Sequence, residues 1–163
     1  MERSDSFFAP PTSKAIPINL VSEAELESWL KVQDPVVQNS ASTHRWKAQL
    51  GQTLVVTENG NPTSVAIGVG NTQSRSRKRF GALAGLSSLP TGIFKLTPLN
   101  MEFAQDFTLG FAMSKYQFNR YNQQSELKAE LICPNELDAN HIQAVVAGEF
   151  LTRDLINTPP NDM

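Results

Sequence analysis

The chain has 163 residues, of which 40% are apolar and 18% charged, and its formal net charge is −2. This composition is typical of one globular domain and excludes a strongly basic protein, so nucleic acid is an unlikely partner. Cys133 is the one cysteine, which excludes an internal disulfide, and the N-terminus lacks the pattern of a signal peptide. No apolar run approaches the roughly 20 residues of a membrane span, so we expect a cytoplasmic protein with no membrane partner.

The N-terminal third begins with residues 1–14, which lack any period and are expected to form a mobile N-terminal arm. The alternation along Ala15–Val21 predicts a strand. Ser22–Glu25 has the pattern of a capping box and predicts the start of a helix. That helix is expected to end at Asp34-Pro35, because proline lacks the backbone donor that a helix interior needs. The pattern of residues 36–50 is ambiguous.

A β-hairpin is the clearest local prediction. Thr53–Thr57 and Ser64–Val69 have the composition of strands, and residues 58–62 between them include the Asn-Gly pair that a tight turn needs. In the second strand, every other residue is small, which lets a helix or a ligand backbone approach that face closely. These small residues are Ala66, Gly68 and Gly70.

The middle of the chain continues the alternation of helices and strands. We expect a helix over Phe80–Ser88, a strand over Ile93–Leu96, a long helix over residues 101–118 and a strand over Leu127–Cys133. The first of these helices places Gly81 and Gly85 on a ridge suited to close packing. The long helix has two apolar stripes, formed by Phe103, Phe107, Phe111 and Phe118 and by Leu109, Met113 and Tyr116.

The last predicted helix also has two apolar faces. Asn135 is its expected cap, and it should run for about twenty residues before the double proline at 159–160 stops it. One face contains Ile142, Val145, Val146, Phe150 and Ile156. The nearly opposite face contains Leu137, Ala144, Gly148, Leu151 and Leu155. Such a helix needs protein on both sides, so we expect this chain to be one domain of a longer protein; the alternative is a central helix enclosed by its own domain.

The order of the predicted elements favours an α/β fold. The predicted order is strand, helix, two strands, helix, strand, helix, strand, helix. The hairpin supplies an antiparallel pair of strands. We therefore predict a mixed β-sheet flanked by helices.

Gly68, Gly70 and Asn71 follow a predicted strand and come before a helix. In α/β sheets, phosphates bind to backbone amides at this place, so these residues are a candidate phosphate loop. The segment lacks both G-x-G-x-x-G and G-x-x-x-x-G-K-[ST], and the alternative is a purely structural turn.

A basic run with Arg75, Arg77, Lys78 and Arg79 is a candidate contact for nucleic-acid phosphates. The alternative is a solvated loop, which the net negative charge of the chain favours. No aromatic residues are interleaved with these side chains to stack on bases.

No catalytic or metal-binding set is visible in the sequence. His44 and His141 have no neighbours at ligand spacing, and Cys133 is expected to be an unreactive thiol of the core. No G-x-S-x-G nucleophile motif occurs. We therefore predict no catalytic residue, no metal ligand and no cofactor in this chain.

Two segments carry a resemblance to a known family. Gly110–Tyr121, with the sequence G-F-A-M-S-K-Y-Q-F-N-R-Y, resembles the G-x-x-L-x-x-Y-x-F-x-x-Y segment of leucyl aminopeptidases, also called cytosol aminopeptidases. Met113 stands where leucine is usual. Val146–Met163 is similar to the linker helix of the same family and its N-T-P-P-N-D-M junction. The two segments occur in the family's order and spacing.

The resemblance implies a fold and a division into domains. In that family the N-terminal domain is similar to macro domains, so we expect a macro-domain-like three-layer sandwich. Residues 15–134 would form this macro-like α/β domain, and residues 135–163 would form the linker helix and the junction to a C-terminal catalytic domain outside this chain. In the family, the catalytic domain holds two divalent metals, Zn or Mn, and the enzyme assembles as a homo-hexamer.

The function that the resemblance implies is that of a non-catalytic N-terminal domain of an enzyme that removes N-terminal amino acids from peptides. Its expected roles are in assembly and in access to the active site, with its own catalytic domain as partner. Two alternatives remain open at this point. One is a macro-like module that binds a nucleotide or ADP-ribose at residues 68–71, and the other is a DNA-contacting domain that uses the basic run at residues 75–79.

Overall fold

The computed structural model describes residues 6–12, 14–118 and 127–159. The first half of the chain contains β1 (Ile16–Ser22), α1 (Leu26–Lys31), α2 (Pro35–Thr43), β2 (Thr53–Glu58), β3 (Asn61–Gly70) and α3 (Thr72–Arg77). The second half contains the 3₁₀ helix η1 (Gly81–Ser88), β4 (Gly92–Leu96), α4 (Met101–Ser114), β5 (Ala129–Leu131) and α5 (Ala139–Asn157). Residues 119–121 and 160–163, which carry part of the resemblance, lie outside the described residues.

The strands form one five-stranded sheet in the order β2-β3-β1-β4-β5. β1 is parallel to β3 and β4, and β4 is parallel to β5, whereas β2 is antiparallel to β3. β2 and β3 are joined at Asn59 and Gly60, whose φ angles of 51° and 80° are those that a two-residue hairpin turn requires. The predicted mixed sheet and its hairpin are confirmed, although β3 begins at Asn61 and the turn is shorter than residues 58–62.

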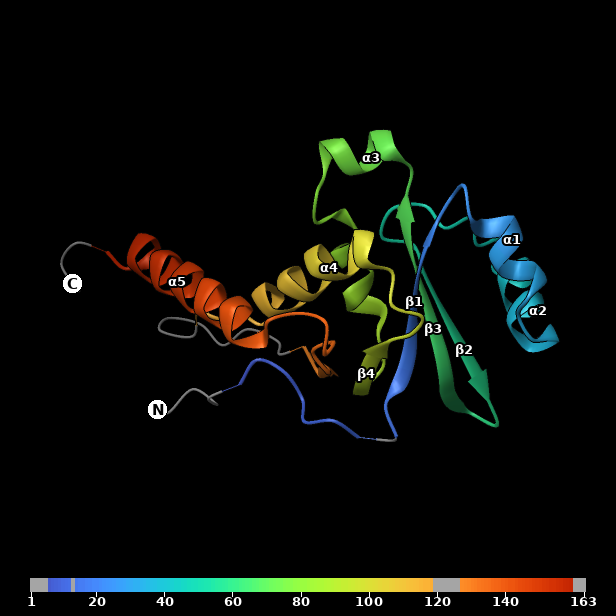
Figure 1. Cartoon of the computed structure of the whole chain (residues 1–163), viewed down its shortest axis with the longest axis horizontal. Coiled ribbons are helices and arrows are strands. Elements are labelled where there is room, and N and C mark those ends of the chain that lie inside the picture. The colour runs from blue at the N-terminus through green and yellow to red at the C-terminus, as the bar shows by residue number, and fades with distance from the viewer. Residues whose placement is uncertain (1–5, 13, 119–126, 160–163) are drawn as a thin grey trace.

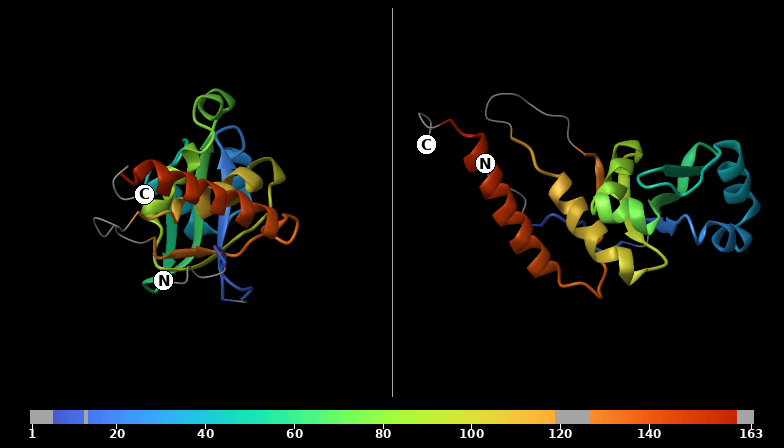
Figure 2. Two further views of the ribbon diagram at one scale, coloured as in Figure 1. Left: turned by 90° about the vertical axis from the view of Figure 1, so that its left-hand side faces the viewer. Right: turned by 90° about the horizontal axis from the view of Figure 1, so that it is seen from above.

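Helices cover both faces of the sheet (Figure 1). On one face, η1 and α4 pack over Ile18, Ile67 and Phe94, which are fully buried. On the other face, α1 and α2 enclose a second core that contains Trp46 and Leu54. α5 lies outside α4, so it forms a further layer away from the sheet, as both views in Figure 2 show. The predicted α/β fold with flanking helices is therefore confirmed, while the likeness to macro domains stays a prediction.

The region around Asp34 differs from the prediction. Asp34 is the N-cap of α2, and Pro35 occupies the first turn of that helix. Proline suits this position because the first amides of a helix have no partner within it. α1 already ends at Lys31, so Pro35 does not end that helix but starts another, in a segment that the sequence left ambiguous. Ser22 lies in β1 and does not cap α1, although its hydroxyl donates a hydrogen bond to the Glu25 carboxylate at 2.6 Å.

The predicted helix at residues 80–88 is a 3₁₀ helix, η1. A 3₁₀ helix repeats every three residues, so it buries a different set of side chains from an α-helix. Gly85 and Leu86 are buried, whereas Phe80 and Ala84 are exposed. The expected close packing is present, because a Cβ atom at Gly85 would lie 2.3 Å from the hydroxyl oxygen of Thr53.

Two elements are shorter than predicted. α4 ends at Ser114, whose hydroxyl donates to the carbonyl of Phe111 at 2.6 Å and so competes with the backbone for that acceptor. Phe118 therefore lies outside the helix. β5 comprises three residues, Ala129–Leu131, which pair with Gly92–Phe94 of β4. Leu127 and Cys133, expected in this strand, flank it instead.

Residues 6–12 pack against the rest of the chain, which corrects the expectation of a mobile arm for this part of residues 1–14. Phe8 and Ala9 are both 8% exposed. The backbone amide of Ala9 donates to the carbonyl of Leu131 at 2.9 Å, so the segment runs beside β5. The ring of Phe7 meets Phe150 of α5 edge to face, with 5.2 Å between the ring centroids. Burial of these apolar side chains holds the segment in place.

Candidate functional site: the outer face of the C-terminal helix

α5 begins four residues later than the predicted cap at Asn135. The N-cap is Asp138, whose carboxylate accepts a hydrogen bond from the backbone amide of His141 at 3.0 Å. Asn135 lies in a turn that closes with a hydrogen bond from the amide of Leu137 to the carbonyl of Pro134. A carboxylate at this position also interacts favourably with the positive end of the helix dipole.

The inner face of α5 is buried against α4. Ile142, Val146 and Phe150 are 6%, 0% and 4% exposed and belong to one apolar cluster with Ala112 of α4. The ring of Phe150 meets Tyr116 edge to face at 5.2 Å between centroids. This cluster also takes in the predicted second stripe of α4, formed by Leu109, Met113 and Tyr116. That stripe therefore finds its partner within the described part of this chain.

Polar contacts fix the last turns of α5. The phenol of Tyr116 donates to Asp154 at 3.0 Å and accepts a hydrogen bond from the side-chain amide of Asn157 at 3.1 Å. The guanidinium of Arg153 lies over the Tyr116 ring at 5.4 Å and also pairs with Glu149 at 2.8 Å. Burial and the hydrogen bond to the Asp154 carboxylate raise the pKa of Tyr116. The end of α5 is thus held in one position relative to α4.

The outer face of α5 is mostly apolar and exposed, and the same arc also contains the exposed polar residues His141 and Thr152. Its large side chains are Val145, Leu151, Leu155 and Ile156, with exposed fractions of 40%, 61%, 53% and 77%. Ala144 and Gly148 lie between them and are also exposed, and nothing lies within 4 Å of a Cβ atom built at Gly148. At about 100° per residue, these six positions span roughly 140° of the helix circumference, and no Asp, Glu, Lys or Arg falls among them. We call them the outer face of α5.

The two predicted apolar faces of α5 are therefore present, with one correction. Val145 and Ile156 were expected beside Ile142 and Val146, but they lie on the outer face. Each is about 80–100° away from the middle of the buried face on a helical wheel, which is too far to reach α4. Leu137, expected on the outer face, precedes the helix and is partly buried.

The residues of the candidate phosphate loop bond to their own chain. The amide of Gly68 donates to the carbonyl of Gln52 at 2.8 Å, and that of Gly70 donates to Ala48 at 3.0 Å. The amide of Asn71 donates to the hydroxyl of Ser74, while its side chain caps α3. A Cβ atom at Gly68 would lie 2.1 Å from the Gln49 carbonyl, so the small face of β3 is occupied by the chain itself. Phosphate binding here stays a prediction that would require these bonds to open.

The basic run begins in α3, which contains Arg75 and Arg77, continues past the helix to Lys78 and Arg79, and is partly paired. Arg75 lies 3.5 Å from Glu102, and Arg79 makes two hydrogen bonds to Asp106, at 2.9 and 2.7 Å. Arg77 and Lys78 are exposed. The carboxylates at 102 and 106 have the same spacing of four residues as the arginines at 75 and 79, so both pairs can form once the two segments lie side by side. Nucleic-acid contact through this run stays a prediction.

Within residues 6–12, 14–118 and 127–159, no group of three or more His, Cys, Asp or Glu side chains could hold a metal ion. Burial raises the pKa of the half-buried Cys133 thiol, with a smaller contribution from the charge of Asp138. In the same part of the chain, no helix has an apolar stretch long enough to cross a membrane.

Comparison with protein families now tests the resemblance. Residues 16–134 match the sequence model of the M17 aminopeptidase N-terminal domain. The chain belongs to the M17 aminopeptidase family. The match covers the sheet and the helices around it, and ends before α5. A comparison with curated protein sequences gave no match.

Two solved structures are similar to this member of the M17 family. The cytosol aminopeptidase from Coxiella burnetii is 29% identical with a TM-score of 0.79, and the similarity covers 94% of this chain and 34% of that one. A leucine aminopeptidase mutant from tomato is 15% identical with a TM-score of 0.62, covering 97% of this chain and 39% of that one, and shares the fold. The chain thus spans between a third and two fifths of the length of these relatives.

Proposed function

We propose that the chain is the non-catalytic N-terminal domain of a leucyl aminopeptidase-like metallopeptidase. In this proposal, its partner is a C-terminal catalytic domain that removes N-terminal amino acids from peptides. The chain contributes to the assembly of the enzyme, as a homo-hexamer in the cytoplasm, and to access to the active site. The two divalent metals, Zn or Mn, that the family resemblance implies would be bound by the catalytic domain.

The observation that carries this proposal is the outer face of α5. Val145, Leu151, Leu155 and Ile156 expose 40–77% of their surface in a stripe without charges. Burying such side chains against another protein surface would contribute about 1 kcal/mol or more for each of them. The inner face and the last turns of α5 are fixed to α4, so the outer face is presented in a defined orientation. A rigid apolar stripe of this kind suits a permanent partner.

The partner that fits this stripe is the catalytic domain. The similarity covers 34% of the cytosol aminopeptidase from Coxiella burnetii, so most of that protein lies outside the part that this chain matches. The resemblance of residues 146–163 to the family's linker helix supports a catalytic domain as the partner of this face. Because the resemblance implies that the catalytic residues lie in the C-terminal domain, we expect the 163-residue chain alone to be inactive.

The test is hydrolysis of leucine p-nitroanilide with added Mn²⁺. The 163-residue chain should show no activity, and the polypeptide encoded by the whole reading frame should show it. In that polypeptide, Leu151→Glu combined with Leu155→Glu should weaken docking and lower both activity and assembly mass. Val32→Glu is the matched control, because Val32 is 80% exposed at the end of α1, remote from α5. A reading frame without a peptidase domain, or a double variant that behaves like Val32→Glu, would contradict the proposal.

A further inference from the structure

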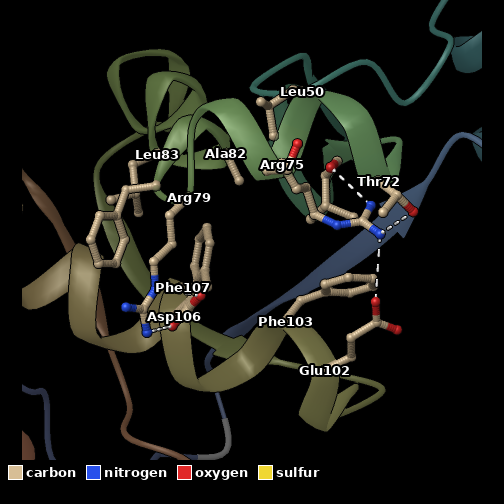
Figure 3. A pocket seen from close by; sticks show the side chains of 13 residues that line it. Leu50, Thr72, Arg75, Arg79, Ala82, Leu83, Glu102, Phe103, Asp106 and Phe107 are labelled. Carbon is tan, nitrogen blue, oxygen red and sulfur yellow. Dashed lines mark hydrogen bonds and ion pairs between the residues drawn. The ribbon is translucent and has the colours of Figure 1, made fainter.

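A cavity of about 390 Å³ lies between α3, η1 and α4, beside the carboxyl end of β3 (Figure 3). Its interior is apolar and includes Leu83, Phe103 and Phe107. At its rim, Arg75 of α3 and Arg79, just after α3, pair with Glu102 and Asp106 of α4. A volume of this size, with apolar walls and a few convergent polar groups, is typical of sites for small molecules.

Arg75 is the least exposed of the four charged side chains that line this cavity. Its Nη1 atom donates to the backbone carbonyls of Val69 and Gly70 at 3.3 and 3.2 Å. Its guanidinium lies over the ring of Phe103 at 4.9 Å, and only 24% of the side chain is exposed. These contacts are with neutral groups, so they orient the guanidinium without cancelling its charge. A cation held in this way suits a carboxylate that approaches its Nη2 atom, whose contacts with the Thr72 hydroxyl and with Glu102 are both 3.5 Å long.

Glu102 lies next to this guanidinium without closing on it. The Oε1 atom of Glu102 is 3.5 Å from Nη2 of Arg75, at the outer limit of a hydrogen bond. The second ion pair of the rim differs, because Arg79 and Asp106 are bonded at 2.7 and 2.9 Å. The cavity therefore has one tight pair and one loose pair. The loose pair presents a positive and a negative group side by side, above the apolar interior.

We propose that this cavity binds an apolar α-amino acid. The ligand's carboxylate would bind Arg75, its ammonium would bind Glu102, and its side chain would lie against Phe103 and Phe107. A simple anion would be repelled by the nearby carboxylates of Glu102 and Asp106, and a simple cation by the two arginines. A zwitterion matches both charges of the loose pair. α5 does not line this cavity, so the inference is independent of the docking proposed above.

The test is titration calorimetry of the 163-residue chain with three ligands. L-leucine carries both charges, 4-methylpentanoate lacks the ammonium, and leucinamide lacks the carboxylate. We expect saturable binding of L-leucine with a Kd below about 1 mM. Each analogue should bind about tenfold more weakly, because each leaves one charged group of the rim without its partner. Absence of L-leucine binding at millimolar concentration would overturn the proposal.

Two variants separate this site from a merely structural ion pair. Glu102→Gln should weaken the binding of L-leucine about tenfold and leave the binding of 4-methylpentanoate unchanged. Only leucine has an ammonium group that would contact the Glu102 carboxylate. The Glu102 side chain is 65% exposed, so the fold tolerates this change. Ser76→Trp, at an exposed position of the lining, should fill the mouth and abolish binding of both ligands.

The matched control is Glu149→Gln, which removes a comparable carboxylate on α5 from its pair with Arg153, outside the cavity. This control should bind L-leucine like the wild-type chain. Equal weakening of leucine and 4-methylpentanoate by Glu102→Gln, or unchanged leucine binding by Ser76→Trp, would overturn the assignment.

Discussion

Tyr116, just after α4, donates a hydrogen bond from its phenol to the carboxylate of Asp154 near the end of α5, at 3.0 Å. The two residues are 38 positions apart, and the bond joins the last turns of the two outer helices. The same phenol oxygen accepts from Asn157 at 3.1 Å. This pair therefore holds the last turns of α5 against Tyr116 and fixes the direction in which its outer face points.

Removing the phenol tests this role. Tyr116→Phe keeps the ring that packs on Phe150 and loses both hydrogen bonds of the hydroxyl, so we expect a loss of about 1 kcal/mol in the free energy of unfolding, measured in urea. Hydrogen exchange should accelerate at residues 153–157 and stay unchanged in β1 and β3. An unaltered exchange rate at the end of α5 would show that the phenol does not hold it.

The same residue predicts how stability depends on alkaline pH. Burial, together with the hydrogen bond to Asp154, raises the pKa of Tyr116 above its ordinary value of 10.0. The folded state then holds the proton more tightly than the unfolded state. The contribution of Tyr116 to the free energy of unfolding is fully present below pH 10 and is lost as pH rises through the folded-state pKa. The wild-type chain should therefore lose more stability above pH 10 than Tyr116→Phe does, and parallel pH curves for the two proteins would refute this.

Neighbouring residues of α5 provide a matched test of its two faces. Phe150 is 4% exposed and Leu151 is 61% exposed. Phe150→Ala should cost about 3–5 kcal/mol of unfolding free energy, because it opens a cavity between α5 and α4. Leu151→Ala should stay within about 0.5 kcal/mol of wild type, because the surface is already in water and alanine favours helix. Comparable losses in the two variants would mean that the outer face is covered within this chain.

Two glycines are predicted to respond in opposite directions to alanine. A Cβ atom at Gly68 would lie 2.1 Å from the Gln49 carbonyl oxygen and 2.4 Å from the Ala48 carbonyl carbon, which are backbone atoms. Gly68→Ala should therefore destabilise the chain by about 1–3 kcal/mol or more. Gly148→Ala has open space and should stabilise α5 by up to about 1 kcal/mol. Thermal unfolding of both variants checks this pair, and a neutral Gly68→Ala would contradict the close packing at β3.

The nucleotide alternative also has an expected outcome. The amides of Gly68 and Gly70 already donate to carbonyls of Gln52 and Ala48, so ADP-ribose would have to break these bonds to bind there. We expect millimolar ADP-ribose to leave the melting temperature unchanged, because a ligand that does not bind the folded state adds no stability. A rise in melting temperature that is lost in Gly68→Ala would instead support the macro-like module.

Local chemistry made part of this fold predictable. Asn59-Gly60 specified the hairpin turn because both residues adopt positive φ readily. The period of 3.6 residues identified both apolar faces of α5. Pro35 was interpreted only as a stop, although proline both ends a helix and starts one, so α2 was missed.

Other features depend on contacts between distant segments. The pairing of Arg75 with Glu102 and of Arg79 with Asp106 requires α3 to lie beside α4, which no local pattern specifies. The same holds for the packing of Phe7 on Phe150, and for the cavity that α3, η1 and α4 enclose. The amides of Gly68 and Gly70 bond to residues 48–52, a connection that a motif search cannot detect.

The most direct measurement of the proposed function is the accessibility of the outer face of α5. Leu155→Cys, with Cys133→Ser to remove the natural thiol, is labelled with a maleimide and quantified by peptide mass spectrometry. A cysteine at the exposed Thr43 serves as the reference site. Leu155→Cys should react as fast as the reference in the 163-residue chain, and at least about tenfold more slowly in the polypeptide of the whole reading frame. Equal labelling rates in the two proteins would show that nothing docks on this face.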